Sequence, residues 1–499
     1  MFKNWKMNRE QIVGIVAIVS LFVIYPLVMT NGYFNLTFTK YVSFIVITLS
    51  LSCLVLWQKG ISAFVGTFLD RLDVTSKFMF AFLLAQVVAF IFSKNKTISF
   101  TGSTDRYMGI VTMCMFVLFF FVIREVEFDK KVFMYVSLTV FDIVVVFSVL
   151  QFFKIDCFWL LQYVTNYRAK NFLSTWGNTG LFGIYSVMMS TVALGFYLET
   201  QKKQDKFFFG VSSFFVYIAM LISNTDATYL GEMFATILIF VFGVKNRQHF
   251  QRFMEVLLLY SCAGSLFHVC YVNIENKRPI AVLGTIAMSY EATIGLLIFG
   301  LFGWCVTQWG IRERDIVYER ISKAVGIVTL TGCIAIPILV IWFSCVDTTS
   351  DLGFLGRYFR FNKDWGTGRG YVWTWSAQIF QHFTWQEKLT GAGQGMVPIL
   401  LQDNYMDEMR RDLGYYFGNA HNVYLHYLLN VGLFGVVSYL GSLVSAVMNG
   451  LTERKDKFKR ICSIAIICCG IVDFFSISQP ITMPLLFFFL AYNSKTVKK

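Results

Sequence analysis

Gly368-Arg369-Gly370-Tyr371 and Ala420-His421-Asn422 lie near the two ends of a long polar stretch in this otherwise apolar chain. Gly391-Ala392-Gly393-Gln394-Gly395 lies between them. Much of the remaining sequence consists of apolar runs of membrane-spanning length, so the fold depends on where the apolar pattern stops and resumes. We expect the chemistry of this protein in residues 365–435, which break that pattern.

Composition places the chain among membrane proteins. Hydrophobic residues make up 56% of its 499 residues and charged residues only 15%, which excludes an ordinary soluble protein. Repeated apolar runs of about 20 residues predict an all-α polytopic fold with about fourteen transmembrane helices. The net charge of +13 does not call for a nucleic-acid partner, because the cytoplasmic loops of membrane proteins collect Lys and Arg.

Charge also predicts the topology. The spans are expected at residues 12–29, 41–57, 78–93, 107–123, 132–152, 180–198, 207–222, 228–243, 253–271, 283–308, 325–345, 422–448, 461–477 and 479–493. With the N-terminus in the cytoplasm, every predicted inner segment carries at least three Lys or Arg residues, as the positive-inside rule requires. Both termini are then cytoplasmic, and the long loop is extracytoplasmic.

The same pattern divides the chain into three parts. Residues 1–345 are expected to form a bundle of about eleven transmembrane helices, residues 346–421 the large extracytoplasmic loop that carries the chemistry, and residues 422–499 about three more helices. The loop is rich in tryptophan, which argues against disorder. We expect two helices in it, over residues 369–386 and 403–411.

Several predicted outer segments are rich in Gly, Ser, Thr, Asn and Asp. They are residues 101–107, 174–180 and 223–228. Such residues cap helices, and the N–H groups at a helix N-terminus attract an anion. Capping alone explains each of these segments taken singly. Together, above one large polar loop, they favour a shared outer site.

His421 is the first candidate for chemistry. It directly precedes a predicted span, and a helix N-terminus disfavours protonation, so its neutral imidazole could accept a proton from a hydroxyl nucleophile. A capping or interfacial histidine explains it as well. We expect no metal, because His421 and His426 point about 140° apart on a helix and no Cys or carboxylate cluster completes a ligand set.

Arg369 is the second candidate, because a guanidinium between two glycines can bind a phosphate through two hydrogen bonds. Arg106, at the outer end of the fourth predicted span, is another candidate for binding an anion. Arg357 and Arg360 are possible supporting residues. Contact with lipid headgroups would explain these arginines equally.

Four acidic residues are predicted to be buried within or beside the spans: Asp142, Glu232, Glu291 and Asp473. Ionisable residues inside a membrane are costly and often functional. In a transporter they would relay protons or ions, and structural pairing explains them equally well.

The order of the motifs resembles the O-antigen ligase and O-antigen polymerase superfamily. Similar to its signature are Gly368-Arg369 followed by Trp373, then residues 391–395, then Ala420-His421-Asn422 with Tyr424-Leu425, then Val431-Gly432-Leu433-Phe434-Gly435. Upstream, Asp105-Arg106-Tyr107-Met108-Gly109 and Gly177-Asn178 are similar to outer motifs of the same family.

The resemblance implies a GT-C-like membrane glycosyltransferase that needs no metal or cofactor. It would invert the configuration at the anomeric carbon of the transferred sugar. It would act at the outer face of the bacterial plasma membrane on a glycan carried by undecaprenyl pyrophosphate, with a glycan, lipid or protein hydroxyl as acceptor. Arg369 and Arg106 would contact the diphosphate, Arg369 and His421 would be catalytic with His421 as the base, and Asn422 would support them. Many members carry arginine where this chain has Asp226. Either Arg106 then supplies the second positive charge or diphosphate binding differs in this protein, and Asp226 is a possible supporting residue.

A lipid-linked oligosaccharide flippase, or another polytopic transporter, is the alternative, since such proteins can also have about fourteen spans. They should show internal repeats and charged central cavities, and no convincing repeat is present here. A signalling or structural protein would leave Arg369 and His421 without a task. Polymerase and ligase activity both remain open, because they differ in the acceptor and no motif specifies it.

Overall fold

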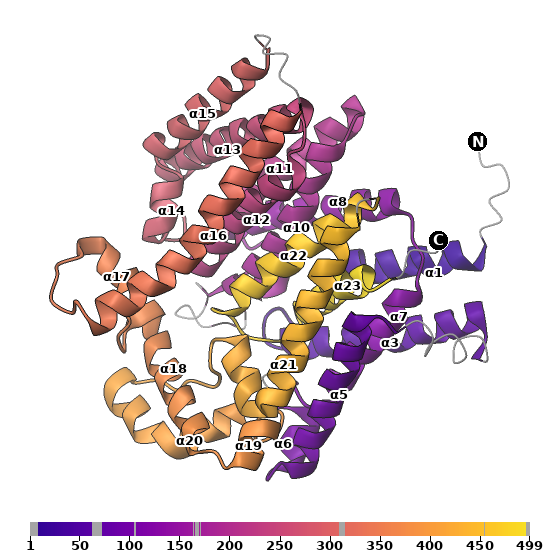
Figure 1. Cartoon of the computed structure of the whole chain (residues 1–499), viewed down its shortest axis with the longest axis vertical. Coiled ribbons are helices and arrows are strands. Elements are labelled where there is room, and N and C mark those ends of the chain that lie inside the picture. Colours follow the sequence, from indigo (N-terminus) through magenta and orange to yellow (C-terminus); the bar gives the residue numbers. More distant parts are fainter. Residues whose placement is uncertain are drawn as a thin grey trace.

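The structure is a computed structural model that describes residues 8–61, 72–103, 106–162, 164, 169, 171–308, 315–453 and 455–495. Long helices pack side by side, and a group of shorter helices gathers at one end of them (Figure 1). Eleven helices among the described residues are long and apolar enough to cross a membrane. The predicted all-α polytopic fold is therefore confirmed.

The long helices follow the predicted spans in order. They are α1 (Arg9–Val19), continued by the π-helical turn η1 (Ser20–Ile24) and α2 (Tyr25–Leu27), then α3 (Leu36–Lys59), α5 (Val74–Phe92), α7 (Ile110–Glu125), α8 (Lys130–Phe152), α10 (Thr179–Glu199), α11 (Lys203–Ser223), α12 (Asp226–Gly243), α13 (Arg247–Asn273), α15 (Tyr290–Gln308), α16 (Ile316–Cys345), α21 (Val423–Thr452), α22 (Lys457–Asp473) and α23 (Met483–Asn493). Three of them, α7, α22 and α23, have only 16, 17 and 11 residues. Each still coincides with a predicted span.

Shorter elements lie between these helices. They are α6 (Lys96–Thr101), β1 (Phe172–Leu173), η3 (Ser174–Trp176), β2 (Gly177–Asn178), α14 (Val282–Ala287), η4 (Gly353–Leu355), α17 (Gly356–Phe359), α18 (Trp365–His382), α19 (Trp385–Thr390), α20 (Val397–Glu408) and η5 (Met409–Leu413). β1 and β2 pair antiparallel, with Leu173 opposite Gly177.

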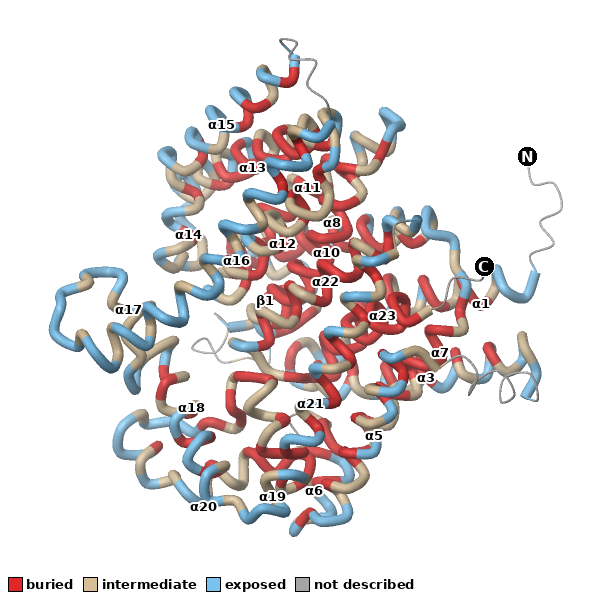
Figure 2. The backbone as a smooth tube through the Cα atoms, viewed as in Figure 1, coloured by how far each residue is buried: buried red, intermediate tan, exposed pale blue. Residues whose placement is uncertain are grey.

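Burial separates the central helices from the peripheral ones. Within the most apolar 18 residues of α10, 94% are buried inside the protein, whereas none are buried in the corresponding stretch of α16. The colours in Figure 2 show this difference. Gly183 and Gly195 of α10 let Thr228 and Ile461 approach so closely that an added Cβ would overlap them. Both helices are apolar all round, so the sequence could not tell a protein-covered helix from a lipid-covered one.

The predicted inner segments contact one another at one end of the bundle, and the predicted outer segments contact one another at the other end. At one end Lys130 pairs with Asp456 at 2.9 Å, which joins two predicted inner segments. At the other end the Tyr33 hydroxyl donates to the carbonyl of Ser174 at 2.6 Å, and the Asn224 amide donates to that of Pro279 at 3.1 Å. These contacts join predicted outer segments. Which end faces the cytoplasm stays a prediction.

The long loop is helical, although its helices begin and end elsewhere than expected. The helix predicted over residues 369–386 ends at His382, where α18 stops, and α19 begins after a capping box made by Thr384 and Glu387. The helix predicted over 403–411 begins earlier, at Val397, and leads into η5. In α18, Val372 and Trp375 pack inward as part of a local apolar core.

The glycine-rich motif at residues 391–395 has a structural task. Gly432 interrupts α21 with φ 65° and ψ −168°, which frees carbonyls from the helical pattern. The N–H groups of Ala392 and Gly393 donate to the carbonyls of Leu429 and Asn430, both at 2.9 Å. The motif therefore fills the break in α21 and donates hydrogen bonds to the carbonyl groups that the break leaves without helical partners. Buried backbone groups of a membrane protein need such partners.

One expectation about the acidic residues is wrong. Glu291 is exposed in the first turn of α15, where an acid suits the positive end of the helix dipole. Glu232 and Asp473 are almost fully buried, and Asp142 is partly buried. Each of these three accepts a hydrogen bond from a hydroxyl: Glu232 from Ser186 and Ser190, Asp142 from Ser212, and Asp473 from Tyr439.

Candidate active site

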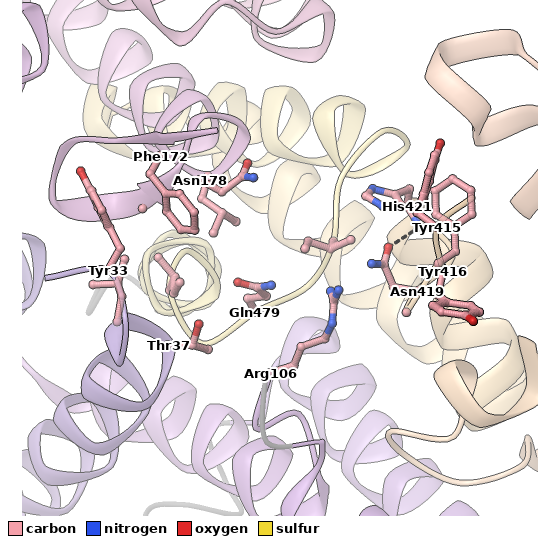
Figure 3. Close-up of a pocket in the computed structure, with 17 residues that line it drawn as sticks. Tyr33, Thr37, Arg106, Phe172, Asn178, Tyr415, Tyr416, Asn419, His421 and Gln479 are labelled. Atoms are coloured by element: carbon pink, nitrogen blue, oxygen red, sulfur yellow. Dashed lines mark hydrogen bonds between the residues drawn. The ribbon is translucent and has the colours of Figure 1, made fainter. Parts of the chain in front are cut away.

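A cavity of about 400 Å³ lies where the predicted outer segments meet (Figure 3). Its walls come from the start of α3, the turn before α7, the β1–β2 hairpin, residues 415–421 of the long loop, and the turn between α22 and α23. The polar side chains that line it are Tyr33, Thr37, Arg106, Asn178, Tyr415, Tyr416, Asn419, His421 and Gln479. Polar groups that converge in one cavity are typical of a ligand site.

Arg106 and His421 share this cavity although they are far apart in sequence. The Arg106 guanidinium lies between Gln479 on one side and Asn419 and His421 on the other (Figure 3). Arg106 is also close enough to His426, one turn into α21, to interact with it electrostatically. A positive charge and an imidazole therefore meet at one wall of the cavity.

His421 is fixed by its neighbours in the chain. Its φ of 46° is left-handed, which costs free energy for a residue with a bulky side chain. Its N–H donates to the Asn419 side chain at 2.7 Å. The next residue, Asn422, caps α21 by accepting bonds from the N–H groups of Tyr424 and Leu425, both at 3.0 Å. These hydrogen bonds hold His421 at the entrance of α21.

The surroundings of His421 keep its imidazole neutral. Burial, the Arg369 guanidinium and the Arg106 guanidinium together lower the pKa of His421 from 6.5 to about 3. Burial is the largest of these causes, because an imidazolium loses hydration there, and the two positive charges act in the same direction. A neutral imidazole can accept a proton, as a general base must.

Arg369 lies beside this cavity and is held by backbone. Gly368 has φ 86°, and a Cβ on Gly370 would overlap the carbonyl of Asn362, so the two flanking glycines are needed for the turn into α18. The Arg369 guanidinium donates to the carbonyls of Gly366 at 2.7 Å and Phe475 at 3.1 Å. Its Nε is buried and makes no hydrogen bond with any described residue, which leaves the Nε–H donor for a ligand.

The predicted pair is brought together in the fold. Arg369 does not line the cavity, yet its charge acts on His421. The two residues, 52 positions apart in the sequence, therefore lie at the same end of the bundle. Asp226, in the first turn of α12, also belongs to this group. Burial lowers the pKa of Arg369, and the nearby Asp226 carboxylate acts in the opposite direction.

The remaining predicted residues have other surroundings. Arg360 donates to the Ser350 carbonyl at 2.7 Å within the loop and to the Phe343 carbonyl of α16 at 3.4 Å, which ties the loop to the end of α16. Arg357 is exposed on α17. Neither Arg357 nor Arg360 lines the cavity. Asp105 of the upstream motif lies outside the described residues.

Some residues that line the cavity or hold Arg369 were not predicted. Gln479 and the carbonyl of Phe475 come from the turn between α22 and α23, where no pattern in the sequence points to a ligand. Tyr415, Tyr416 and Asn419 directly precede the predicted histidine, and their aromatic and amide side chains could have been read as a binding loop. Among the described residues, no group of three or more His, Cys, Asp or Glu side chains could hold a metal ion.

Comparison with known proteins agrees with the motifs. Residues 280–440 match the family model described as O-antigen ligase. This range contains α15, α16, the long loop and the first part of α21, hence both Arg369 and His421. No curated protein matches the chain. The match supports an O-antigen ligase or polymerase type of role, and residues 280–440 of the chain are similar to that family.

Proposed function

We propose that this protein transfers a glycan from a polyprenyl diphosphate carrier, undecaprenyl pyrophosphate, to an acceptor hydroxyl at the cavity between Arg106 and His421. One observation carries the proposal. The fold places a partly buried, neutral imidazole within the electrostatic reach of two guanidinium groups, in a chain whose residues 280–440 match the O-antigen ligase family model. Two guanidinium groups can bind a diphosphate through charge-assisted hydrogen bonds, and a neutral imidazole can accept the proton of an attacking hydroxyl.

The two arginines are proposed to bind the diphosphate. In the transfer, the bond between the sugar C1 and the diphosphate oxygen breaks, and negative charge grows on that oxygen. Guanidinium groups already in place stabilise such charge without reorganisation. Arg106 points into the cavity, and Arg369 approaches from the side with its Nε free of hydrogen bonds to the described residues.

His421 is proposed as the base. The acceptor oxygen attacks C1 from the face opposite the diphosphate, its proton passes to the His421 imidazole, and the diphosphate departs with the bonding electron pair. This displacement inverts the configuration at C1. No step in it calls for a metal ion or another cofactor.

Donor binding should tune the base. Without a ligand, Arg369 and Arg106 help to lower the pKa of His421 to about 3, which makes a weak base. A bound diphosphate offsets both positive charges, so the pKa of His421 rises toward its ordinary range. The imidazole then accepts a proton more readily when the donor is in place.

The location follows from the same proposal. We place the protein in the bacterial plasma membrane with both termini in the cytoplasm, so that the cavity and residues 346–421 face outward. The charge pattern supports this orientation. Asn422 supports the site by capping α21 beside His421, and Arg360 supports it by anchoring the loop to the Phe343 carbonyl of α16. Arg357 precedes Arg360 in the same loop and lies on α17.

Glycan transfer by the purified protein tests the proposal directly. The substrate is a lipid-linked oligosaccharide, and products are followed by mass spectrometry. His421→Ala should lower kcat by roughly 10²–10⁴-fold, the usual contribution of a general base. His382→Ala is the matched control, because His382 is an exposed histidine of the same loop whose ring nitrogen lies 2.7 Å from the Gln378 carbonyl. Equal rates for wild type and His421→Ala would remove the proposed base.

A further inference from the structure

A second cavity lies among the spanning helices. It has a volume of about 270 Å³ and is bounded by α11, α12, α13 and α15, which pack near one another (Figure 1). Its walls are mostly apolar and include Met220, Met233 and Leu296. Methionine side chains adapt to irregular apolar ligands. This volume lies just below the range of about 300–1,000 Å³ that is typical of pockets for drug-sized ligands, so it suits part of one apolar chain rather than a bulkier ligand.

Glu232 brings a carboxyl group into this apolar wall. The residue is 3% exposed and lines the cavity. The hydroxyls of Ser186 and Ser190 lie 2.8 and 2.7 Å from its Oε1. Its Oε2 is buried and makes no hydrogen bond with any described residue. A buried oxygen without a partner is costly, and more so where water is scarce.

The other polar groups of the cavity are already paired. The Tyr217 hydroxyl donates to the Ala287 carbonyl at 2.7 Å, and the Tyr260 hydroxyl lies 3.5 Å from the Thr236 hydroxyl. Oε2 of Glu232 is therefore the acceptor that a ligand can use. Glu232 is six residues into α12, about 9 Å along the helix from its start. In a helix that crosses the bilayer, that depth lies below the polar headgroup layer.

We propose that this cavity binds a long-chain alcohol of the membrane: one apolar chain whose hydroxyl donates a hydrogen bond to Glu232. The apolar walls take the chain, and the hydroxyl supplies the donor that Oε2 lacks. An ammonium group fits less well, because a single carboxyl would have to offset the loss of hydration of a full charge. A plain alkane fills the space and leaves Oε2 unpaired.

The site is separate from the transfer reaction. Its residues lie on α11, α12, α13 and α15, and none of them lines the cavity that holds Arg106 and His421. The inference therefore does not depend on the proposed function. It gives Glu232, one of the buried acids noted in the sequence, a ligand.

Competition for photolabelling tests the site. The full-length protein is placed in phosphatidylcholine nanodiscs and labelled with a diazirine derivative of hexadecanol, and the labelled peptides are identified by mass spectrometry. Label is expected on α11, α12 or α13 around the cavity. Unlabelled hexadecanol should compete roughly tenfold better than hexadecane, as one added hydrogen bond allows. Equal competition by the alkane, or stronger competition by hexadecylamine, overturns the proposal.

Variants separate the carboxyl from the fold. In Glu232→Leu, hexadecanol and hexadecane should compete equally well, while the photolabel still reacts with the helices around the cavity. Asp142→Leu is the matched control, because Asp142 also accepts a serine hydroxyl bond, from Ser212 at 2.8 Å, and does not line this cavity. It should keep the preference. If Glu232→Leu does not fold, Met233→Trp decides, since it fills the cavity and should abolish labelling. Full labelling of Met233→Trp would contradict the site.

Discussion

Replacing Arg369 by Gln should raise the pKa of His421, and this tests whether the fold brings the two residues together. Gln keeps a hydrogen-bonding side chain and removes the positive charge. Loss of a nearby positive charge favours the imidazolium, so the pKa rises. In the unchanged protein the pKa is about 3, held there first by burial and then by Arg369 and Arg106.

The size of the rise follows from Coulomb's law. Two unit charges on the order of 5–10 Å apart interact by about 1.7–3.3 kcal/mol at an effective dielectric constant of about 20. Each pKa unit corresponds to about 1.4 kcal/mol, so one arginine accounts for roughly 1–2 units. We expect a pKa of about 4–5 in Arg369→Gln. It should stay below 6.5, because burial is the larger cause and is unchanged.

Nuclear magnetic resonance of ¹³C-labelled histidine measures this pKa. The chain has only five histidines, and His421→Gln assigns the signal. Arg411→Gln is the control, because Arg411 pairs with Asp412 on the surface of the same loop at 2.7 Å and should leave the His421 pKa unchanged. An unchanged pKa in Arg369→Gln would show that the guanidinium is not near the imidazole. A pKa above 6.5 would show that burial is not the main cause.

Three further substitutions probe the architecture around the site. Gly432→Ala should lower the free energy of unfolding by at least about 2 kcal/mol in thermal melts, because φ is 65° and a Cβ would overlap the backbone of Leu389; Gly332→Ala, which has open space around it, should not. Asn422→Ala should cost about 1 kcal/mol through loss of the helix cap and lower glycan transfer, whereas Asn422→Ser should restore both. Asp226→Asn should lower the Kd for a short-chain polyprenyl diphosphate about fivefold in calorimetry, because a negative charge near Arg369 repels the ligand; an unchanged Kd would place the ligand elsewhere.

The sequence determined the class of fold and its two ends. Apolar runs long enough to cross a membrane can only be helices, because backbone groups in lipid must bond within their own segment. The basic residues of the inner segments sorted the loops, and contacts such as Lys130–Asp456 join the segments that were sorted together. His421 and Arg369 stood out because they are polar residues at the borders of an apolar pattern.

Burial and partnership were decided by the tertiary structure. Periodicity could not rank α10 against α16, since lipid and protein interiors are equally apolar. It could not show that residues 391–395 fill the break at Gly432, or that Glu291 is exposed. The cavity itself combines residues from five separate parts of the chain, among them Gln479. Long-range packing sets such distances, and a local pattern holds no information about them.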